Sequence, residues 1–542
     1  DHNIGFGYAT GEKMTSGEYN IFVGHAAGSC VCDGDHNIAM GSNALRSSGT
    51  VSSNTSTCNI AIGKDSGKSM TSGNQNVLIG RGAGEAITTA ERNVYLGITA
   101  GGATATGNDN VAAGYGAALN NTGTYNIMFG RYAGTTQTSG AANVFIGANV
   151  AKCHTTGDCN VFIGNEAGSH AASSGGTGTN NIGMGCKALT GLTSGEKNIA
   201  IGEAAGRVMT SGGQNVLIGQ LSGAETTTGS KNIFIGPDAG CNVRGNSHNV
   251  FVGCAAGRCR CAGDNNIAMG TEALKGCSTI SNNSGAYNVA FGYQSGLNVS
   301  TGAYNVSLGY RSMSSCTVTA ACTVAIGMDA GKNLTSGINN IFLGSAAGCG
   351  SNSITGQNNV IGGTHAGRKI TGGSYNVLFG LAVGCEITTG SANIILGKYA
   401  GQLVSDGDAS IFLGQCAGRY RGGSSNNIAL GAKAGEGSST PANNTGGFNI
   451  TIGDCAGAEI TSGCNNIFLG CKAGIGHTNA PENIFLGNCA GASAAGTKNN
   501  AYCYNIGIGN STAKNLLQGI KNIVVGTEAL LTNECASGNI VI

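Results

Sequence analysis

Apolar and polar positions recur along this chain with a period of about seventeen residues. Each repeat opens with Asn, continues with three apolar residues of which the first is Ile or Val, and reaches Gly four positions after the Asn; a clear copy runs from Asn20 to Gly28. We call the Asn position 0. There are 31 starts between Asn3 and Asn539, Thr323 and Ser410 replacing Asn in two of them, and 22 of the 30 spacings equal the full period. Such self-similarity predicts a repeat architecture.

The apolar run after each Asn predicts a short strand, since it is rich in β-branched and aromatic residues and lies between Asn and Gly. Apolar-Thr pairs such as Met70-Thr71 and Met209-Thr210 predict a second short strand in each repeat. A unit this short cannot hold a helical hairpin repeat. We therefore expect an all-β chain without a helical domain: residues 1–542 form one continuous parallel β-solenoid (β-roll) of about 31 coils, uncapped at both ends, with equivalent residues ~4.8 Å apart.

The repeated residues have separate predicted roles. The Asn is expected to form a ladder of side-chain amides between coils, and the Gly to occupy a corner with positive φ or no room for Cβ. Because side chains alternate along a strand, Ile21 and Val23 share a face, which we place inside the coil, so that Phe22 points outward. This outer apolar stripe predicts self-association, because a soluble monomer does not expose so large a patch. The stripe contains Phe22, Phe145, Phe162, Phe234, Phe251, Phe342, Phe412, Phe468 and Phe485.

Composition agrees with a repeat fold and excludes several functional classes. Gly is 97 of 542 residues, but Pro is only 3 and no Gly-X-Y period exists, so the chain is not collagen-like. The net charge of +1 gives no electrostatic footprint for nucleic acid. We find no apolar run long enough to cross a bilayer as a helix, and therefore expect no membrane insertion in this segment. The chain opens in mid-pattern at Asp1 without Met, which indicates a processed or truncated piece of a longer protein.

The unit Asn-Ile-Ala-Ile-Gly-x-x-Ala, as at Asn59–Gly63 and Asn198–Ala205, resembles the head repeats of trimeric autotransporter adhesins. Similar repeats occur in phage and algal-virus tail-fibre proteins. The resemblance covers essentially the whole chain and implies a left-handed parallel β-roll with three chains side by side. Two features depart from that group: the repeat unit is longer than the usual head repeat, and Cys is abundant.

Five coils are longer than the rest by four or five residues, starting at Asn37, Asn160, Asn266, Asn427 and Asn483. Their extra residues are Ser, Thr, Asn and Gly, which predicts loops bulging from one corner, a common place for binding functions. Some of these loops contain Asn-x-Ser/Thr sequons, which accept glycans in secreted proteins but also arise by chance in such a composition. The candidate glycosylation sites are Asn54, Asn282, Asn443, Asn120, Asn298, Asn333 and Asn510.

The 22 cysteines favour disulfides, and therefore an oxidising, extracellular setting. Stacking brings cysteines at similar places in adjacent coils within bridging distance, and pairs six residues apart before a strand could close a corner. A further neighbouring set is Cys455, Cys471 and Cys489. The other candidates are Cys241 with Cys259, Cys261 with Cys277, Cys153 with Cys159, and Cys316 with Cys322.

The sequence gives no catalytic, cofactor-binding or metal site. Paired Cys-x-x-Cys motifs and clustered His are absent, which argues against zinc. Asp33-Gly-Asp35 and Asp406-Gly-Asp408 lack the calcium-repeat pattern and are interpreted as solvated turns, and Gly183-Met-Gly185 is a by-product of the repeat. A Thr column keeps ice binding as a minor alternative; it contains Thr15, Thr71, Thr88, Thr210, Thr335, Thr371, Thr388 and Thr461.

These observations predict a non-enzymatic structural subunit of a rigid fibre, outside the cell or on a cell or virion surface. Its expected partner is itself, as a homo-oligomer (a trimer by resemblance) or as an end-to-end polymer, because an exposed solenoid end is an unpaired strand edge. The alternative is a receptor-binding adhesin or a viral or phage tail fibre that contacts a cell-surface receptor or glycan through the loops of the long coils.

Overall fold

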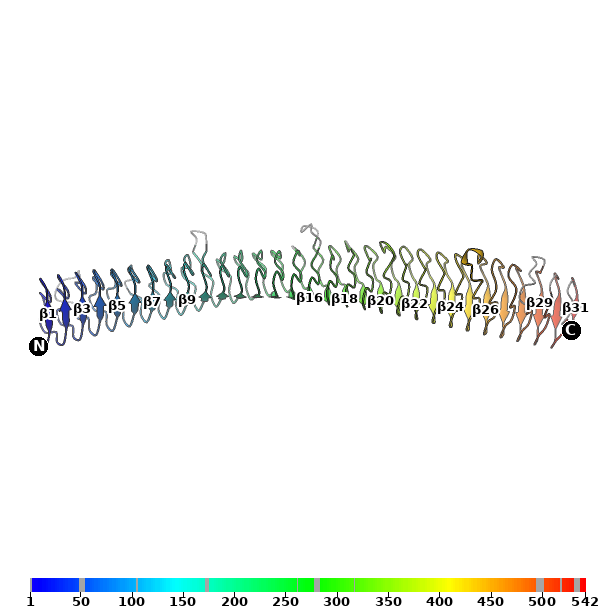
Figure 1. Cartoon of the computed structure of the whole chain (residues 1–542), viewed down its shortest axis with the longest axis horizontal. Coiled ribbons are helices and arrows are strands. Elements are labelled where there is room, and N and C mark those ends of the chain that lie inside the picture. Colours follow the sequence, from blue (N-terminus) through cyan, green and yellow to red (C-terminus); the bar gives the residue numbers. More distant parts are fainter. Residues whose placement is uncertain are drawn as a thin grey trace. The chain divides into compact units, whose positions relative to one another are not determined.

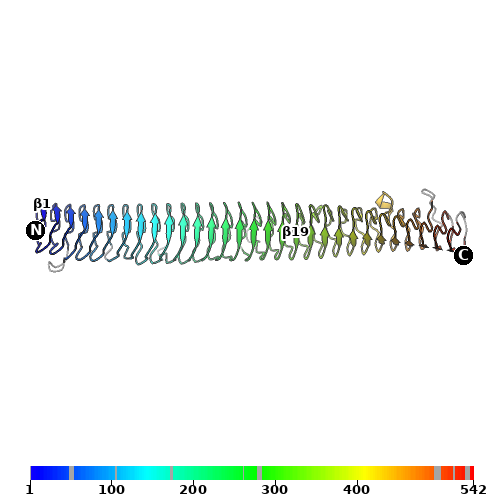
Figure 2. The same cartoon turned by 90° about the horizontal axis from the view of Figure 1, so that it is seen from below.

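The computed structural model describes residues 2–47, 54–103, 106–170, 175–260, 262–276, 283–315, 317–493, 502–516, 519–530 and 537–542. The chain divides into two compact units, Asp1–Asn266 and Ile267–Ile542. Each unit is a stack of coils, and each coil contributes one short strand (Figures 1 and 2). The expected parallel β-solenoid is therefore confirmed, and each copy of the sequence repeat contributes one strand.

The strands follow the repeat. The first unit contains β1 (Ile4–Phe6), β2 (Ile21–Val23), β3 (Ile38–Met40), β4 (Ile60–Ile62), β5 (Val77–Ile79), β6 (Val94–Leu96), β7 (Val111–Ala113), β8 (Ile127–Phe129), β9 (Val144–Ile146), β10 (Val161–Ile163), β11 (Ile182–Met184), β12 (Ile199–Ile201), β13 (Val216–Ile218), β14 (Ile233–Ile235) and β15 (Val250–Val252).

The second unit has the same organisation. It contains β16 (Ile267–Met269), β17 (Val289–Phe291), β18 (Val306–Leu308), β19 (Val324–Ile326), β20 (Ile341–Leu343), β21 (Val360–Gly362), β22 (Val377–Phe379), β23 (Ile394–Leu396), β24 (Ile411–Leu413), β25 (Ile428–Leu430), β26 (Ile450–Ile452), β27 (Ile467–Leu469), β28 (Ile484–Leu486), β29 (Ile506–Ile508), β30 (Ile523–Val525) and β31 (Ile540–Val541). One 3₁₀ turn, η3 (Pro441–Asn443), lies in a long coil.

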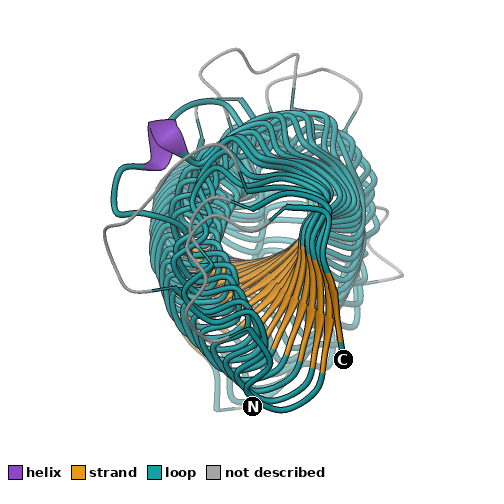
Figure 3. Cartoon of the chain, turned by 90° about the vertical axis from the view of Figure 1, so that its right-hand side faces the viewer, coloured by secondary structure: helices purple, strands orange, loops and turns teal. Residues whose placement is uncertain are grey.

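Within each unit, neighbouring strands pair in parallel and in register, so every repeat position forms a column along the stack. In β12 and β13, for example, Ile199 pairs with Val216 and Ile201 with Ile218. Viewed along the stack, the strands form one wall of the coil and irregular turns close the rest (Figure 3). Extra residues of the long coils leave this outline without changing the register, as between β25 and β26.

The prediction of a second strand in each coil is wrong for the described residues. The apolar-Thr segment forms only isolated bridges, such as the one between Leu334 and Ile354. The reason is a turn: the N–H groups of Thr71, Ser72 and Gly73 all donate to the single carbonyl of Thr88, at 2.9, 3.2 and 3.2 Å. A strand ladder needs one acceptor for each donor, so a turn that directs three donors to one carbonyl ends the sheet.

Four columns fill the interior of the coil. They are the Asn at position 0, the central strand residue at position 2, Ala at position 7 and a mostly apolar residue at position 11. In the coil that starts at Asn198, the members are Asn198, Ala200, Ala205 and Met209, each 0% exposed. These side chains are excluded from solvent and form the core of the coil.

The strand orientation predicted from the sequence is therefore reversed. Phe22 is 1% exposed, whereas Ile21 is 36% exposed. The cause is parity: the Asn side chain lies inside, so the residue two positions later also lies inside and its neighbours lie outside. Room for the ring comes from Gly at position 8, where a Cβ on Gly28 would approach the Phe22 ring to 2.6 Å. The whole predicted stripe is core: Phe22, Phe145, Phe162, Phe234, Phe251, Phe342, Phe412, Phe468 and Phe485.

The predicted asparagine ladder is present. Asn198 donates from Nδ2 to Asn181 Oδ1 at 3.0 Å and to the Gly212 carbonyl at 2.9 Å. Its Oδ1 accepts the backbone N–H and the Nδ2 of Asn215, at 3.0 and 2.9 Å. Each buried amide thus satisfies its own polar atoms and closes the turn in front of the next strand, which offsets the cost of burying it.

Candidate self-association interface

The outer face of the strand wall is apolar throughout. In the described strands, position 1 is always Ile or Val, and position 3 is always apolar or, once, Gly362. Ile201 and Ile235 are 38% and 37% exposed, although in an ordinary sheet one face of such a strand would be polar. Strands that are apolar on both faces are typical of sheets buried on both faces, which makes this wall a candidate interface.

The exposed apolar side chains are confined to this one side of the coil. Of the large apolar residues that are exposed in the described part of the chain, all but Ile338 and Ile520 occupy positions −1, 1, 3 and 5, which are the strand face and the two positions that border it. We call positions −1 and 5 the two rims. An apolar centre with aromatic, more polar margins is the anatomy of a protein–protein interface.

Tyrosines line both rims beside β17 and β18. Tyr287 and Tyr304 stack at position −1 with ring centroids 5.0 Å apart, and Tyr293 and Tyr310 stack at position 5 with centroids 5.4 Å apart. Between them Phe291 is 40% exposed. The spacing between coils sets these distances. Exposed aromatic rings of this kind are typical anchors of protein–protein interfaces.

Charges occur on the rims and not on the strand face. Arg92 and Asp109 stack at position −1, where Nε and Nη2 donate to the two carboxylate oxygens at 2.6 and 3.0 Å. The Arg92 guanidinium holds the pKa of the Asp109 carboxyl below its usual range. Both groups are surface-exposed, so the pair is screened by solvent and neutralises the rim more than it stabilises the fold.

The size of the face exceeds what a monomer normally exposes. Three strand residues are about 10 Å wide, and fifteen strands about 4.8 Å apart give the first unit a flat apolar area of roughly 700 Å². The largest apolar patch of a typical monomer is about 300–600 Å². Two such faces would bury roughly 1,400 Å², which lies within the range of about 1,200–2,000 Å² for stable complexes.

Among the described residues, the structure forms no Cys153–Cys159 bridge. Cys153, Cys159, Cys241 and Cys322 carry free thiols. Burial raises the pKa of the Cys241 thiol, which disfavours the reactive thiolate. Among the remaining candidates, Cys455 and Cys471 are also free, and Cys261, Cys277 and Cys316 lie outside the described residues.

The predicted glycosylation sites differ in access. Asn54 is only 3% exposed and donates from Nδ2 to the Met70 carbonyl at 3.1 Å, so the folded chain leaves no room for a glycan on that side chain. Asn282 lies outside the described residues. Asn120, Asn443 and Asn510 are exposed, and Asn298 and Asn333 are half-buried.

The threonine column does not favour ice binding. Thr71, Thr210 and Thr371 donate their hydroxyl groups to the carbonyls of Thr88, Thr227 and Thr388 in the next coil, at 3.2, 3.2 and 3.1 Å. A surface that orders water needs hydroxyl groups free to bond it, and these donors are used inside the solenoid.

Four buried ionisable residues at one repeat position were missed by the sequence analysis. They share one place, position 11 of the coil directly before a long coil; they are His154, Arg260, Arg421 and His477. In the described copies of the regular coils, no other position 11 is charged or His. Arg421 reaches into the long coil, where Nε donates to the Gly435 carbonyl at 2.8 Å and Nη1 to the Gly446 carbonyl at 3.3 Å. Coil length was the signal that could have identified them.

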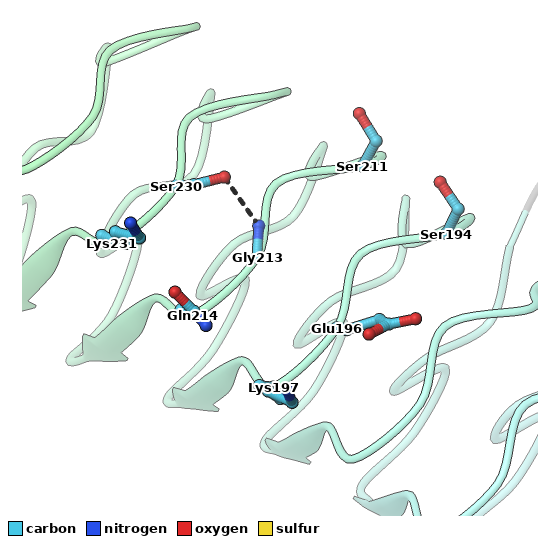
Figure 4. A pocket seen from close by; sticks show the side chains of 8 residues that line it. All are labelled: Ser194, Glu196, Lys197, Ser211, Gly213, Gln214, Ser230 and Lys231. Carbon is cyan, nitrogen blue, oxygen red and sulfur yellow. Dashed lines mark hydrogen bonds between the residues drawn. The ribbon is translucent and has the colours of Figure 1, made fainter.

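Two surface grooves cross the described coils. The first borders the strand face, crosses the coils that start at Asn181, Asn198 and Asn215, and carries Lys197, Gln214 and Lys231 in a row on its wall (Figure 4). There the N–H of Gly213 donates to Ser230 Oγ of the next coil at 3.0 Å, a bond between coils that is separate from the asparagine ladder. The second lies beside η3, between Lys369 and Pro441.

Among the described residues there is no cluster of three or more His, Cys, Asp or Glu that could hold a metal ion. A helix long and apolar enough to cross a membrane is likewise absent from the described ranges. Comparison of the chain with known protein families and with curated proteins finds no match. The strand face is therefore the feature from which function can be argued.

Proposed function

We propose that this protein is a non-enzymatic structural subunit of an extracellular fibre or filament, and that copies pack side by side through the outer strand face. The observation that carries the proposal is the apolar column at positions 1 and 3, which only Gly362 interrupts in the described strands, with Ile201 and Ile235 more than one third exposed. Its partner is a second copy because the face is uncharged and periodic at the coil spacing, so that an identical wall matches its spacing.

The resemblance to adhesin head repeats supports the same arrangement, since three chains pack side by side in that group. It also keeps a second candidate, an adhesive or tail fibre that binds a surface receptor. One observation favours that candidate: η3 projects from the long coil that starts at Asn427 and borders a groove with the ion pair Lys369–Glu386, 2.5 Å long. In both candidates the stack of coils is the rigid shaft.

Charge substitutions in the face test the proposal. Sedimentation of the purified chain at micromolar concentration should give an oligomer, and the triple variant I201K/I218K/I235K should give a monomer, because association would bury the added charges. The matched control S194K/S211K/T228K adds the same charge at exposed positions outside the strand face, each in the coil before the corresponding face residue, and should stay oligomeric. A wild-type chain that sediments as a monomer would refute side-by-side packing.

A further inference from the structure

The exposed cysteines have an ordered distribution. Of the 18 described cysteines, the exposed ones are Cys58, Cys159, Cys186, Cys254, Cys322 and Cys471. Three occupy position −1 (Cys58, Cys159 and Cys322) and three occupy position 5 (Cys186, Cys254 and Cys471), so all six lie on the two rims of the strand face. Exposed free thiols are unfavourable on a soluble surface, and their confinement to the rims connects them with whatever covers the face.

Bridges within one chain are excluded among these six residues. Positions −1 and 5 stand on opposite sides of the strand, six residues apart in nearly extended chain, which separates their Cα atoms by roughly 15 Å or more. A disulfide requires Cα atoms within about 7 Å. Cysteines of this set on the same rim are separated by several coils. Any bridge between two of the six must therefore join different molecules.

Side-by-side packing brings opposite rims together. Consider a cyclic assembly whose rotation axis is parallel to the stack of coils. The strands of all copies then run in the same direction around that axis. The end of one strand then faces the start of the strand in the next copy, and the position 5 rim lies against the neighbour's position −1 rim. Three cysteines on each rim suit this arrangement, but a bridge also requires the two to lie at the same height.

One pair meets that requirement. Cys159 precedes the coil that starts at Asn160, and Cys186 belongs to the next coil, which starts at Asn181. Consecutive coils differ in height by about 4.8 Å, within the usual Cα separation of a disulfide. Cys58 offers the contrast: the nearest position 5 cysteine, Cys186, lies seven coils away, or roughly 34 Å.

We infer that Cys159 of one copy and Cys186 of a neighbouring copy form an intermolecular disulfide that locks the fibre laterally; this inference depends on the proposed side-by-side packing. The two thiols lose two protons and two electrons as the S–S bond forms. A small-molecule disulfide such as oxidised glutathione accepts the electrons and is released as two thiols. In each contact, one copy provides Cys159 from its position −1 rim and the neighbouring copy provides Cys186 from its position 5 rim. A closed ring of copies therefore holds one bridge for each contact.

Cross-linking of the purified chain with oxidised glutathione, followed by non-reducing electrophoresis and peptide mass spectrometry, tests the inference. The wild type and the control C58S should give covalent oligomers with a Cys159–Cys186 peptide. C159S and C186S should each lose them, and a mixture of C159S with C186S should regain a covalent heterodimer. Cross-linking that survives in either single variant would overturn the assigned pair.

Sedimentation in reducing buffer separates this inference from the proposed function. An oligomer in reducing buffer that gives no covalent product with oxidised glutathione would overturn the disulfide and leave side-by-side packing intact. A chain that is monomeric in reducing buffer and forms no covalent product would overturn both.

Discussion

At the scale of single residues, glycine sets how closely coils approach. The Gly at position 4 has positive φ and stacks directly on the same Gly of the next coil. At Gly380 φ is +143°, and a Cβ would lie 2.6 Å from the Gly397 carbonyl oxygen. Side chains rarely adopt this backbone conformation, and the close contact is with backbone, which cannot move aside.

G380A should therefore lower the free energy of unfolding by about 1–3 kcal/mol from backbone strain, with the contact adding to it. G372A is the matched control in a neighbouring coil, because its Cβ would meet nothing nearer than Thr389 Cγ2 at 3.7 Å, and it should be neutral or slightly stabilising. Urea denaturation of the two variants measures the difference. Equal stability of the two variants would contradict this role of position 4.

Residue roles were only partly predictable from sequence. The Asn ladder followed from composition and period, but β-branched Ile21 was placed inside and Phe22 outside because both are apolar and strand-forming. Side chains two positions apart point to the same side of a strand, so the buried Asn20 places Phe22 inside the coil. Gly28 allows this orientation, because its lack of a side chain leaves room for the Phe22 ring. The prediction of an outer apolar stripe was therefore correct in kind and wrong in its members.

At the scale of elements, each column behaves as one unit, and interruptions in it are informative. Ser410 interrupts the asparagine ladder: Asn393 Oδ1 accepts only the backbone N–H of residue 410, at 2.9 Å, and Ser410 Oγ accepts the N–H of Asn427 at 3.2 Å. A hydroxyl is too short to reproduce the amide-to-amide bond seen at Asn198.

S410N should complete the ladder and raise the unfolding free energy by about 1 kcal/mol, the usual net value of an added hydrogen bond. N198S, the reverse change in an intact part of the ladder, should lower it by about 1–3 kcal/mol because it removes partners from buried polar atoms. Thermal and urea denaturation of both variants measure the effect. If S410N were destabilising, the ladder would not be the element that sets coil stability.

The buried histidines in the column at position 11 predict that the folded protein loses stability at acidic pH. His154 and His477 are buried, and burial lowers the pKa of each to about 4. His154 packs edge-on against the rings of Phe145 and Phe162, and Nε2 of His477 contacts the Gly491 carbonyl. The fold thus holds both imidazoles neutral, whereas in the unfolded chain they titrate near pH 6.5.

Because the folded-state pKa is depressed for a base, stability is complete above pH 6.5 and falls as pH decreases from 6.5 to about 4. Each histidine should account for about 3 kcal/mol of that loss. The double variant H154L/H477L replaces both histidines with Leu, an apolar residue like those at position 11 in most coils. It should flatten the pH dependence of stability across this range. H248L, at an exposed position −1, should leave it unchanged. Denaturation midpoints measured from pH 7 to pH 4 provide the comparison.

At the scale of the whole molecule, the period, the fold class and the parallel register could be predicted, because each depends on repetition alone. The residues of the outer face could not, since they depend on which strand side chains point away from the interior. Each coil contacts only its neighbours, so the interior of each unit is saturated along the stack. The outer strand face is the remaining unsatisfied surface, and stability should therefore depend on association.

That dependence predicts a melting temperature that rises with protein concentration. If the native form is an oligomer, each tenfold increase in concentration stabilises the assembly by about 1.4 kcal/mol for each bimolecular contact, by mass action. The face variant I201K/I218K/I235K should melt at a temperature independent of concentration, and S194K/S211K/T228K should follow the wild type. Reducing buffer keeps rim thiols from contributing. A wild-type melting temperature that is constant over a hundredfold concentration range would show that the apolar wall is covered by something other than a second copy.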